Sequence, residues 1–378
     1  MNIRELQEIS TMHNNHELIK AFAEECKKKI TEFDEAKVHC GLIGPSGSGK
    51  SSLINAIAGE KIAEVGVVET TMDPQDFTHK GIIFTDLPGC GTVKWPQNDY
   101  IERLKLYTYD CLILITAERF TDNDVFLFKE LSSRGKPCFV VRNKLDRAIE
   151  DGSLDNNYTE EETRQIIIKN IRENLGSSCP DKIYLTSARH PTKYDLDELL
   201  NDITEALTGM KRERFIADMG TYSKEALKKK RKVAQERIPL HAGLAAANGL
   251  NPIPGVDISV DIGILLNLSR QIAHIYGLTP SQFEYIKRLV GPKTIPGLIA
   301  KVAQFSTKYL AKEGLILLLK RIASQTTAKQ ASKWIPFVGP LIAAGIGWSA
   351  TFLLGEQIMD EAEALASEIL EEVLYGST

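Results

Sequence analysis

The chain lacks the features that mark several classes of protein. Its six cysteines form no CxxC pair, no cluster of histidines accompanies them at metal-ligand spacing, and three of them lie inside apolar runs, which indicates free thiols in a reducing compartment. The first ten residues, MNIRELQEIS, hold no apolar signal core, and we expect no secretion. The basic run at 228–232 has no interleaved aromatic residues, which argues against binding of single-stranded nucleic acid. We therefore expect a cytoplasmic protein, with nucleic acid as a disfavoured partner.

Charge is divided unevenly along the 378 residues. Hydrophobic residues make up 43% and charged residues 25%, which excludes wholesale disorder, and the length suggests two domains. The formal charge of −4 combines −10 over residues 1–210 with +6 over residues 211–378. A basic half attracts anionic partners such as lipid headgroups, so the second half is the candidate for a membrane contact.

Short apolar runs alternate with helical patterns between residues 37 and 209. The expected strands are 38–43, 81–85, 111–116, 137–141 and 182–185. The expected helices between them are 51–58, 122–132, 160–174 and 195–207. This alternation predicts an α/β domain over 37–209 with a mostly parallel sheet and helices on both faces. Strand signals stop near 210, so we expect 210–378 to be all-α, with a basic helix at 211–237. The amphipathic residues 1–36 would complete that helical domain.

A phosphate-binding loop follows the first predicted strand. The sequence Gly44-Pro45-Ser46-Gly47-Ser48-Gly49-Lys50-Ser51 satisfies GxxxxGK[ST] and opens a helix that continues with Ser52. Glycines let successive backbone N–H groups face the phosphates, and the helix N-terminus adds partial positive charge. Lys50 is expected on the β- and γ-phosphates and the Ser51 hydroxyl on Mg²⁺. These residues predict a site for a nucleoside triphosphate with magnesium.

Three further motifs follow in the order that a GTPase requires. Asp86 and Gly89 of DLPG stand after an apolar run, where the carboxylate would lie beside Mg²⁺ and the glycine N–H would sense the γ-phosphate. In NKLD, which contributes Asn143, Lys144 and Asp146, the carboxylate of Asp146 can accept two hydrogen bonds from the N1 and N2 edge of guanine, whereas adenine offers no such pair of donors. After the last predicted strand, the pair Ser187-Ala188 would pack on the base. The motifs together predict binding of GTP and GDP.

The sequence resembles the immunity-related GTPases, a branch of the dynamin-like superfamily. The resemblance is carried by GVVETTM at 66–72, DLPGCG at 86–91 and AERF at 117–120, and it covers most of 37–210. It implies that Thr71 closes on Mg²⁺ together with Ser51 and Asp86, and that Glu69 takes part in turnover beside Lys50. Around NPIPGVD, at 251–257, the chain looks closer to bacterial relatives of this family.

Cys90 occupies the position after DLPG, where small switch GTPases carry a glutamine that orients the attacking water. A thiol does this poorly, so we expect slow turnover by the isolated chain. The resemblance implies that self-association through the nucleotide-binding domains, as a dimer or larger oligomer, supplies the missing groups.

Two features of the second half leave alternatives open. The 21 uncharged residues at 335–355 could be a buried helix, a membrane-inserting segment or a membrane span. The run at 228–232 could be a solvated face or a contact for anionic lipid or, less readily, RNA. We expect a dynamin-like GTPase that is peripherally membrane-associated. The alternative is a soluble regulatory or assembly-factor GTPase whose helical half docks a protein or RNA partner.

Overall fold

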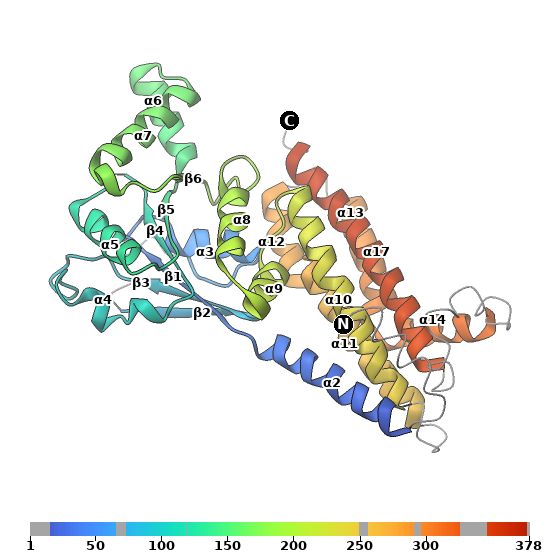
Figure 1. The fold of residues 1–378 in the computed structure, drawn as a ribbon. Coiled ribbons are helices and arrows are strands. Elements are labelled where there is room, and N and C mark those ends of the chain that lie inside the picture. The colour runs from blue at the N-terminus through green and yellow to red at the C-terminus, as the bar shows by residue number, and fades with distance from the viewer. Residues whose placement is uncertain are drawn as a thin grey trace. The chain divides into compact units, whose positions relative to one another are not determined.

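A six-stranded sheet with the strand order β2-β3-β1-β4-β5-β6 forms the centre of one half of the protein (Figure 1). The computed structural model describes residues 16–65, 73–118, 120–248, 256–290, 296–325 and 346–375. The strands are β1 (Val38–Ile43), β2 (Gln75–His79), β3 (Ile82–Leu87), β4 (Cys111–Thr116), β5 (Cys138–Arg142) and β6 (Tyr184–Leu185). All neighbouring strands pair in parallel except β2, which runs antiparallel to β3. The α/β fold class with a mostly parallel sheet is confirmed.

The edge strand β2 has no counterpart among the expected strands. Its residues are mostly exposed, so it lacks the apolar run that marks the buried strands. A tight turn at Lys80, whose φ is 53°, folds it back onto β3. The strand therefore exists because of its pairing with β3 and not because of a hydrophobic pattern of its own.

Helices connect the strands and cover both faces of the sheet. They are α3 (Lys50–Ala58), α4 (Tyr100–Arg103), α5 (Asp122–Ser133), α6 (Leu145–Asn156), α7 (Glu160–Leu175), α8 (Leu196–Ala206) and α9 (Gly209–Asp218), with 3-10 turns at Leu106–Thr108 and Gly176–Ser178. Capping boxes start two of them, with Thr121 and Asp124 at α5 and Thr159 and Glu162 at α7.

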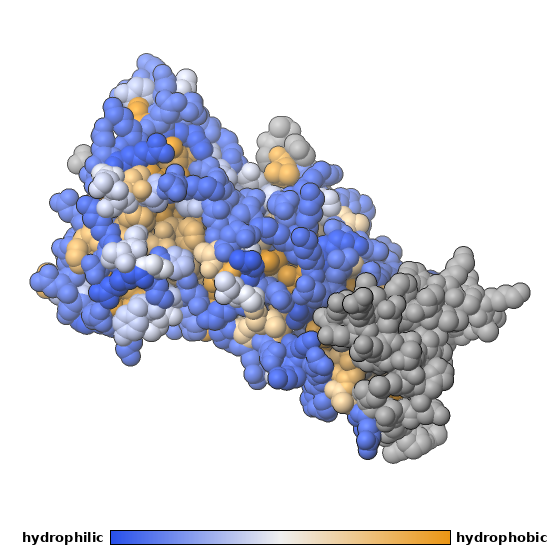
Figure 2. Space-filling view, in the orientation of Figure 1, coloured by the Kyte–Doolittle hydropathy of each residue, from blue (hydrophilic) through white to orange (hydrophobic). Residues whose placement is uncertain are grey.

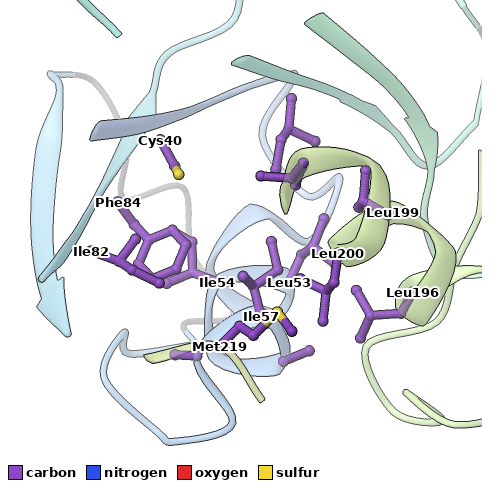
Figure 3. Packing of buried hydrophobic residues seen from close by; sticks show 14 of the residues in the cluster. Cys40, Leu53, Ile54, Ile57, Ile82, Phe84, Leu196, Leu199, Leu200 and Met219 are labelled. Carbon is purple, nitrogen blue, oxygen red and sulfur yellow. The ribbon is translucent and has the colours of Figure 1, made fainter. Parts of the chain in front are cut away.

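Two hydrophobic clusters hold this α/β arrangement together. In the first, side chains of β1 and β3 pack against α3 and α8, as Figure 3 shows for Phe84, Leu53 and Leu200. The second lies between the sheet and helices α4, α5 and α7, with Tyr100 and Leu127 fully buried. Alternate residues of β1, β3, β4 and β5 thus enter opposite clusters, which is why these strands are largely apolar.

The chain divides into two compact units. The sheet unit comprises the described residues of Ala36–Ala226, Pro280–Pro292 and Leu370–Thr378. The helical unit comprises those of Met1–Glu35, Leu227–Thr279 and Lys293–Ile369. Helix α12 (Pro280–Val290) thus belongs to the sheet unit although the segments on either side of it belong to the helical unit. The sequence-based boundaries at 36 and 209 stay predictions.

The helical unit joins chain segments from both ends of the sequence. Its helices are α2 (His16–Glu35), α10 (Lys224–Asn248, which begins in the sheet unit), α11 (Val256–Ile275), α13 (Pro296–Phe305), a π-helical turn at Ser306–Leu310, α14 (Lys312–Gln325) and most of α17 (Ile346–Tyr375). A glycine allows α2 to approach α10 closely, because a Cβ on Gly243 would lie 2.6 Å from Cys26 Sγ and 2.9 Å from Phe22. Small residues at such points set the distance between packed helices.

Two buried polar residues lie inside the helical unit on α10. The Nδ1 atom of His241 lies 2.8 Å from the Arg237 carbonyl oxygen, and burial lowers the pKa of His241 to about 4. The guanidinium of Arg237 stacks on the Phe33 ring at 4.3 Å. His241 is therefore neutral at pH 7, and this core contains a group that resists protonation.

The prediction of one continuous basic helix at 211–237 is wrong. Helix α9 ends at Asp218 and α10 begins at Lys224, so 219–223 is a linker. The Gly220 N–H donates to the Ile57 carbonyl oxygen of α3 at 2.8 Å, a partner that a continuous helix would not allow. A long-range backbone contact thus overrides the local helical pattern.

The lysine run at 228–232 is not a uniformly solvated face. Lys230 is 1% exposed and its Nζ donates to the Ile275 carbonyl oxygen at 2.6 Å, at the C-terminal end of α11. A cation there complements the partial negative charge of the helix end. Arg231 pairs with Asp360 at 2.9 Å and with Glu363 on α17. Lys230 and Arg231 are thus engaged within the helical unit.

The uncharged stretch at 335–355 falls only partly on described residues. Its last ten residues begin α17, where Ala350 and Leu354 are buried, while 335–345 lie outside the described residues. A Cβ on Gly355 would lie 2.9 Å from Ile238 and 3.0 Å from Leu268, so α17 packs tightly on α10 and α11. Over the described ranges, no helix is long and apolar enough to cross a membrane. The face shown in Figure 2 is mainly hydrophilic wherever residues are described.

Candidate nucleotide-binding site

The loop between β1 and α3 has the tight geometry that its glycines permit. A Cβ on Gly44 would lie 2.1 Å from the Ile115 carbonyl oxygen of β4. Gly47 and Gly49 have φ values of 79° and 89°, in the left-handed region that favours glycine. Pro45, Ser46 and Gly47 are exposed at the rim, whereas Ser48 is buried. The loop thus has the backbone geometry expected of a phosphate cradle, and its binding of phosphate stays a prediction.

Lys50 lies inside this loop at the first position of α3. Its Nζ donates to the Gly44 carbonyl oxygen at 2.8 Å and to that of Pro45 at 3.3 Å, and it is 3.5 Å from Asp86 Oδ1. Only 5% of the residue is exposed. Burial lowers the pKa of Lys50, and the neighbouring carboxylate of Asp86 opposes that effect. The Lys50 amine is therefore held inside the loop, next to the Asp86 carboxylate.

Ser51 and Asp86 meet beside the cradle and supply oxygen ligands suited to magnesium. The Ser51 hydroxyl donates to Asp86 Oδ2 at 3.2 Å. Mg²⁺ prefers oxygen ligands, retains several waters and takes few groups from the protein, so one hydroxyl and one carboxylate beside a phosphate site fit it. Bound there, Mg²⁺ would neutralise charge on the phosphate oxygens. Across the described ranges, no cluster of three or more His, Cys, Asp or Glu could hold a metal ion.

Ser52 and Gly89 flank this centre. Ser52 is half-buried on the first turn of α3. Gly89 packs close to the loop, since a Cβ on it would lie 3.4 Å from Pro45 Cα and 3.6 Å from the Gly44 carbonyl oxygen. Two elements that are distant in sequence, the glycine loop with the start of α3 and the DLPG segment, thus meet at the carboxyl ends of β1 and β3.

The NKLD residues lie next to the same loop and link it to β5. Asn143 is 1% exposed, and its Nδ2 donates to the carbonyl oxygens of Ser48 at 3.1 Å and Gly49 at 3.4 Å. Lys144 has a left-handed φ of 59° and its Nζ donates to the Gly47 carbonyl oxygen. The two side chains therefore brace the cradle, in addition to any role they have toward the base.

Asp146 lies in the first turn of α6, beside the loop after β6. The Leu145 N–H donates to the Thr186 carbonyl oxygen at 2.9 Å, which joins the two loops. Asp146 Oδ2 is 4.0 Å from the exposed Arg189 guanidinium. Ser187 is buried and Ala188 is half-buried in the same loop. The predicted base-recognition residues are thus assembled in one place.

Part of the predicted site cannot be placed. Glu69 and Thr71 fall within 66–72, and Arg119 of AERF is likewise outside the described residues. Their expected roles stay predictions.

Cys90 follows DLPG and is half-buried against the second hydrophobic cluster. Burial raises its pKa to about 11, with the carboxylate of Asp124 adding to the effect. The group after DLPG is therefore a neutral thiol at pH 7.

Sequence reasoning missed one positioning residue, Asn55 on α3. It is 5% exposed; its Nδ2 donates to the Ala63 carbonyl oxygen at 2.8 Å, and its Oδ1 accepts from the N–H groups of Ile62 and Ala63, each at 2.8 Å. These bonds fix the loop that leads into 66–72. The available signal was a lone amide in the otherwise apolar second half of KSSLINAIA, a position where an unpaired polar group is costly.

Comparison with known proteins shows which family the chain is similar to. The sequence profile of the family described as Interferon-inducible GTPase (IIGP) matches residues 3–290. The chain is 33% identical to Interferon-inducible GTPase 1 of Mus musculus over 246 residues, covering 61% of this chain and 59% of that protein. It is 26% identical to Interferon-inducible GTPase 5 of Rattus norvegicus over 387 residues, covering 97% of this chain and 83% of that protein.

Among solved structures, a probable GTP-binding protein engB is 22% identical with a TM-score of 0.32, covering 45% of this chain and 98% of that one; this score is too low to bear on function. The family profile covers most of the chain, and its match extends from before β1 to the end of α12. The chain belongs to the interferon-inducible GTPase family.

Proposed function

We propose that the protein binds GTP with Mg²⁺ and hydrolyses it to GDP. The observation that carries the proposal is the position of Lys50, which is buried in a glycine loop beside the Ser51–Asp86 pair. Lys50 would bind the β- and γ-phosphates, the N–H groups at the start of α3 would face the phosphates, and Ser51 with Asp86 would hold magnesium. Catalysis of phosphoryl transfer consists mainly of such positioning and charge stabilisation.

Binding of nucleotide by Lys50→Ala tests this site. Charge-assisted hydrogen bonds contribute about 1.5–3 kcal/mol each, so losing those of Lys50 should weaken GTP binding by about a hundredfold. Lys94→Ala, which removes an exposed lysine paired with Asp73 in the same unit, is the control and should bind normally. Undiminished hydrolysis by a folded Lys50→Ala protein would show that the site is elsewhere.

Slow turnover by the isolated chain, accelerated by self-association, forms the second part of the proposal. The neutral, half-buried thiol of Cys90 is a poor group for orienting water, so a second copy would supply what this position lacks. The turnover rate per molecule should then rise with protein concentration. A constant rate over a hundredfold dilution would exclude activation by self-association.

Coupling to an anionic membrane is the third part. It is supported by the net charge of +6 over 211–378, since each basic residue near an acidic membrane contributes about 1 kcal/mol. Flotation with vesicles containing phosphatidylserine, in GTP, in GDP and without nucleotide, tests it. Binding in at least one state is expected, and its absence from all three would count against this part.

A second candidate function is a regulatory GTPase whose helical half docks a protein partner. The engagement of Lys230 and Arg231 inside the helical unit favours it, because these cations are not available to lipid headgroups. This candidate predicts nucleotide binding without flotation, so the vesicle experiment separates the two.

A further inference from the structure

The C-terminal end of α3 is held by a linker that sequence reasoning had placed inside a helix. The final carbonyls of a helix lack partners within it and must find others. In α3 the Ile57 carbonyl oxygen accepts from Gly220 N–H at 2.8 Å, and the Ala56 carbonyl oxygen accepts from the Tyr222 hydroxyl. Figure 3 shows Met219 beside Ile57, so apolar packing accompanies these hydrogen bonds.

Close packing at this end leaves the linker little freedom. A Cβ on Gly59, the residue that caps α3, would lie 2.9 Å from Gly220 Cα. Just before the linker, Asp218 is fully buried and accepts from Gly81 N–H at 2.7 Å, at the turn that precedes β3. The short segment from Asp218 to Tyr222 is therefore hydrogen-bonded both to α3 and to the turn between β2 and β3. Helix α3 carries Lys50 and Ser51, and strand β3 carries Asp86.

Tyr285 of α12 connects that helix to Tyr222 of the linker. Tyr222 and Tyr285 are both buried and hydrogen-bonded to each other. Because the Tyr222 proton is directed at the Ala56 carbonyl, the Tyr285 hydroxyl is the donor to Tyr222. Burial raises the pKa of Tyr285 to about 12, which keeps this hydroxyl protonated. Leu289, one helical turn farther along α12, packs against the first hydrophobic cluster.

We propose that Tyr222 and Tyr285 are positioning residues for nucleotide binding, which link the docking of α12 to the phosphate cradle through the Ala56 carbonyl of α3. This inference rests on the proposed nucleotide site. Helix α3 has nine residues, about 14 Å, and moves as a rigid rod, so a shift at its last turn displaces the N–H groups at its first. Such coupling is reciprocal: if docking of α12 strengthens nucleotide binding, the nucleotide strengthens docking by the same factor.

The choice of α12 as the linked element follows from its place in the chain. It is part of the sheet unit, yet the residues before Pro280 and after Pro292 belong to the helical unit. A change in its docking is therefore passed along the backbone to both flanking segments.

The test uses the full chain and measures affinity for GDP and for a non-hydrolysable GTP analogue. Tyr285→Phe and Tyr222→Phe each remove one hydroxyl and keep the ring. One net hydrogen bond corresponds to about two- to tenfold in an equilibrium constant, so each variant should bind nucleotide about two- to tenfold more weakly. The double variant should bind nucleotide only slightly more weakly than the single variant with the lower affinity, because both hydroxyls act through the Ala56 carbonyl. The matched control is Tyr309→Phe, which removes a buried hydroxyl bonded to Glu361 at 2.6 Å in the helical unit and should leave affinity unchanged.

The second readout is the change in amide hydrogen exchange over Pro280–Val290 that nucleotide causes, compared within each variant so that a difference in overall stability between variants is taken into account. Saturating nucleotide should slow exchange in α12 of the wild-type chain, and Tyr222→Phe should abolish most of that difference. Wild-type affinity in Tyr285→Phe, or α12 exchange that ignores nucleotide, would overturn the inference while leaving the proposed function intact. A wild-type chain that binds no guanine nucleotide would overturn both.

Discussion

Gly49→Ala tests the geometry of the phosphate cradle without removing any functional side chain. Gly49 has a φ of 89°, and a Cβ there would lie 2.5 Å from Asn143 Nδ2. The left-handed conformation costs an L-residue about 1–2 kcal/mol. The close contact adds to this, because Asn143 must retreat from the Ser48 and Gly49 carbonyl oxygens, with a net loss of about 0.5–1.5 kcal/mol for each hydrogen bond. The expected decrease in the free energy of unfolding is therefore about 2–5 kcal/mol.

Gly135→Ala is the matched control for the cost of placing an alanine in the left-handed backbone conformation. Gly135 has a φ of 67° and no atom within 4 Å of an added Cβ, so only conformational strain should appear. Urea denaturation of both variants, with and without GDP, separates the two terms. In an Asn143→Ala background, where these hydrogen bonds are already absent, Gly49→Ala should cost only the conformational strain. If Gly49→Ala destabilised the protein no more than Gly135→Ala does, the brace between Asn143 and the loop would not exist as described.

Three further predictions concern residues away from the phosphate cradle. Asn55→Ala should lower the free energy of unfolding by about 2–4 kcal/mol in urea, since buried donors and an acceptor in the following loop lose their partners; a neutral result would refute that role. Gly243→Ala should cost about 1–3 kcal/mol through its contact with Cys26, and a second substitution, Cys26→Ala, should restore most of it. His241 has a folded-state pKa of about 4, below its ordinary value of 6.5, so the unfolded chain binds more protons between these values. The free energy of unfolding should therefore fall by up to about 3 kcal/mol from pH 6.5 to pH 4 in wild type but not in His241→Gln.

The sequence predicted the strands that are buried and the motifs that follow them. Parallel strands such as β1 and β4 are apolar on both faces, so they are visible as runs, and the residues after them reach the same edge of the sheet. The edge strand β2 was missed because its stability comes from pairing with β3 and not from burial.

The remaining differences come from contacts between residues far apart in the chain. The basic helix expected at 211–237 is interrupted because Gly220 and Tyr222 bond to α3, more than 160 residues earlier. The burial of Lys230 depends on the end of α11, 45 residues later. These partners lie outside any window of sequence in which a local pattern is detected. For the same reason, a run of like charges in a sequence does not show which cations reach solvent.

The central claim is that a guanine nucleotide binds between the glycine loop and Asp146. Calorimetric titration of the wild-type chain and of Asp146→Asn with GTP, ATP and xanthosine triphosphate, each with Mg²⁺, tests it most directly. The Asp146 carboxylate would accept from guanine N1 and N2, whereas an asparagine amide would offer one acceptor to N1–H of xanthine and one donor to its O2. We predict that wild type binds GTP far more tightly than ATP or the xanthine nucleotide, and that Asp146→Asn prefers xanthosine triphosphate. Equal affinities of the wild-type chain for GTP and ATP, or an unchanged preference in the variant, would contradict this account.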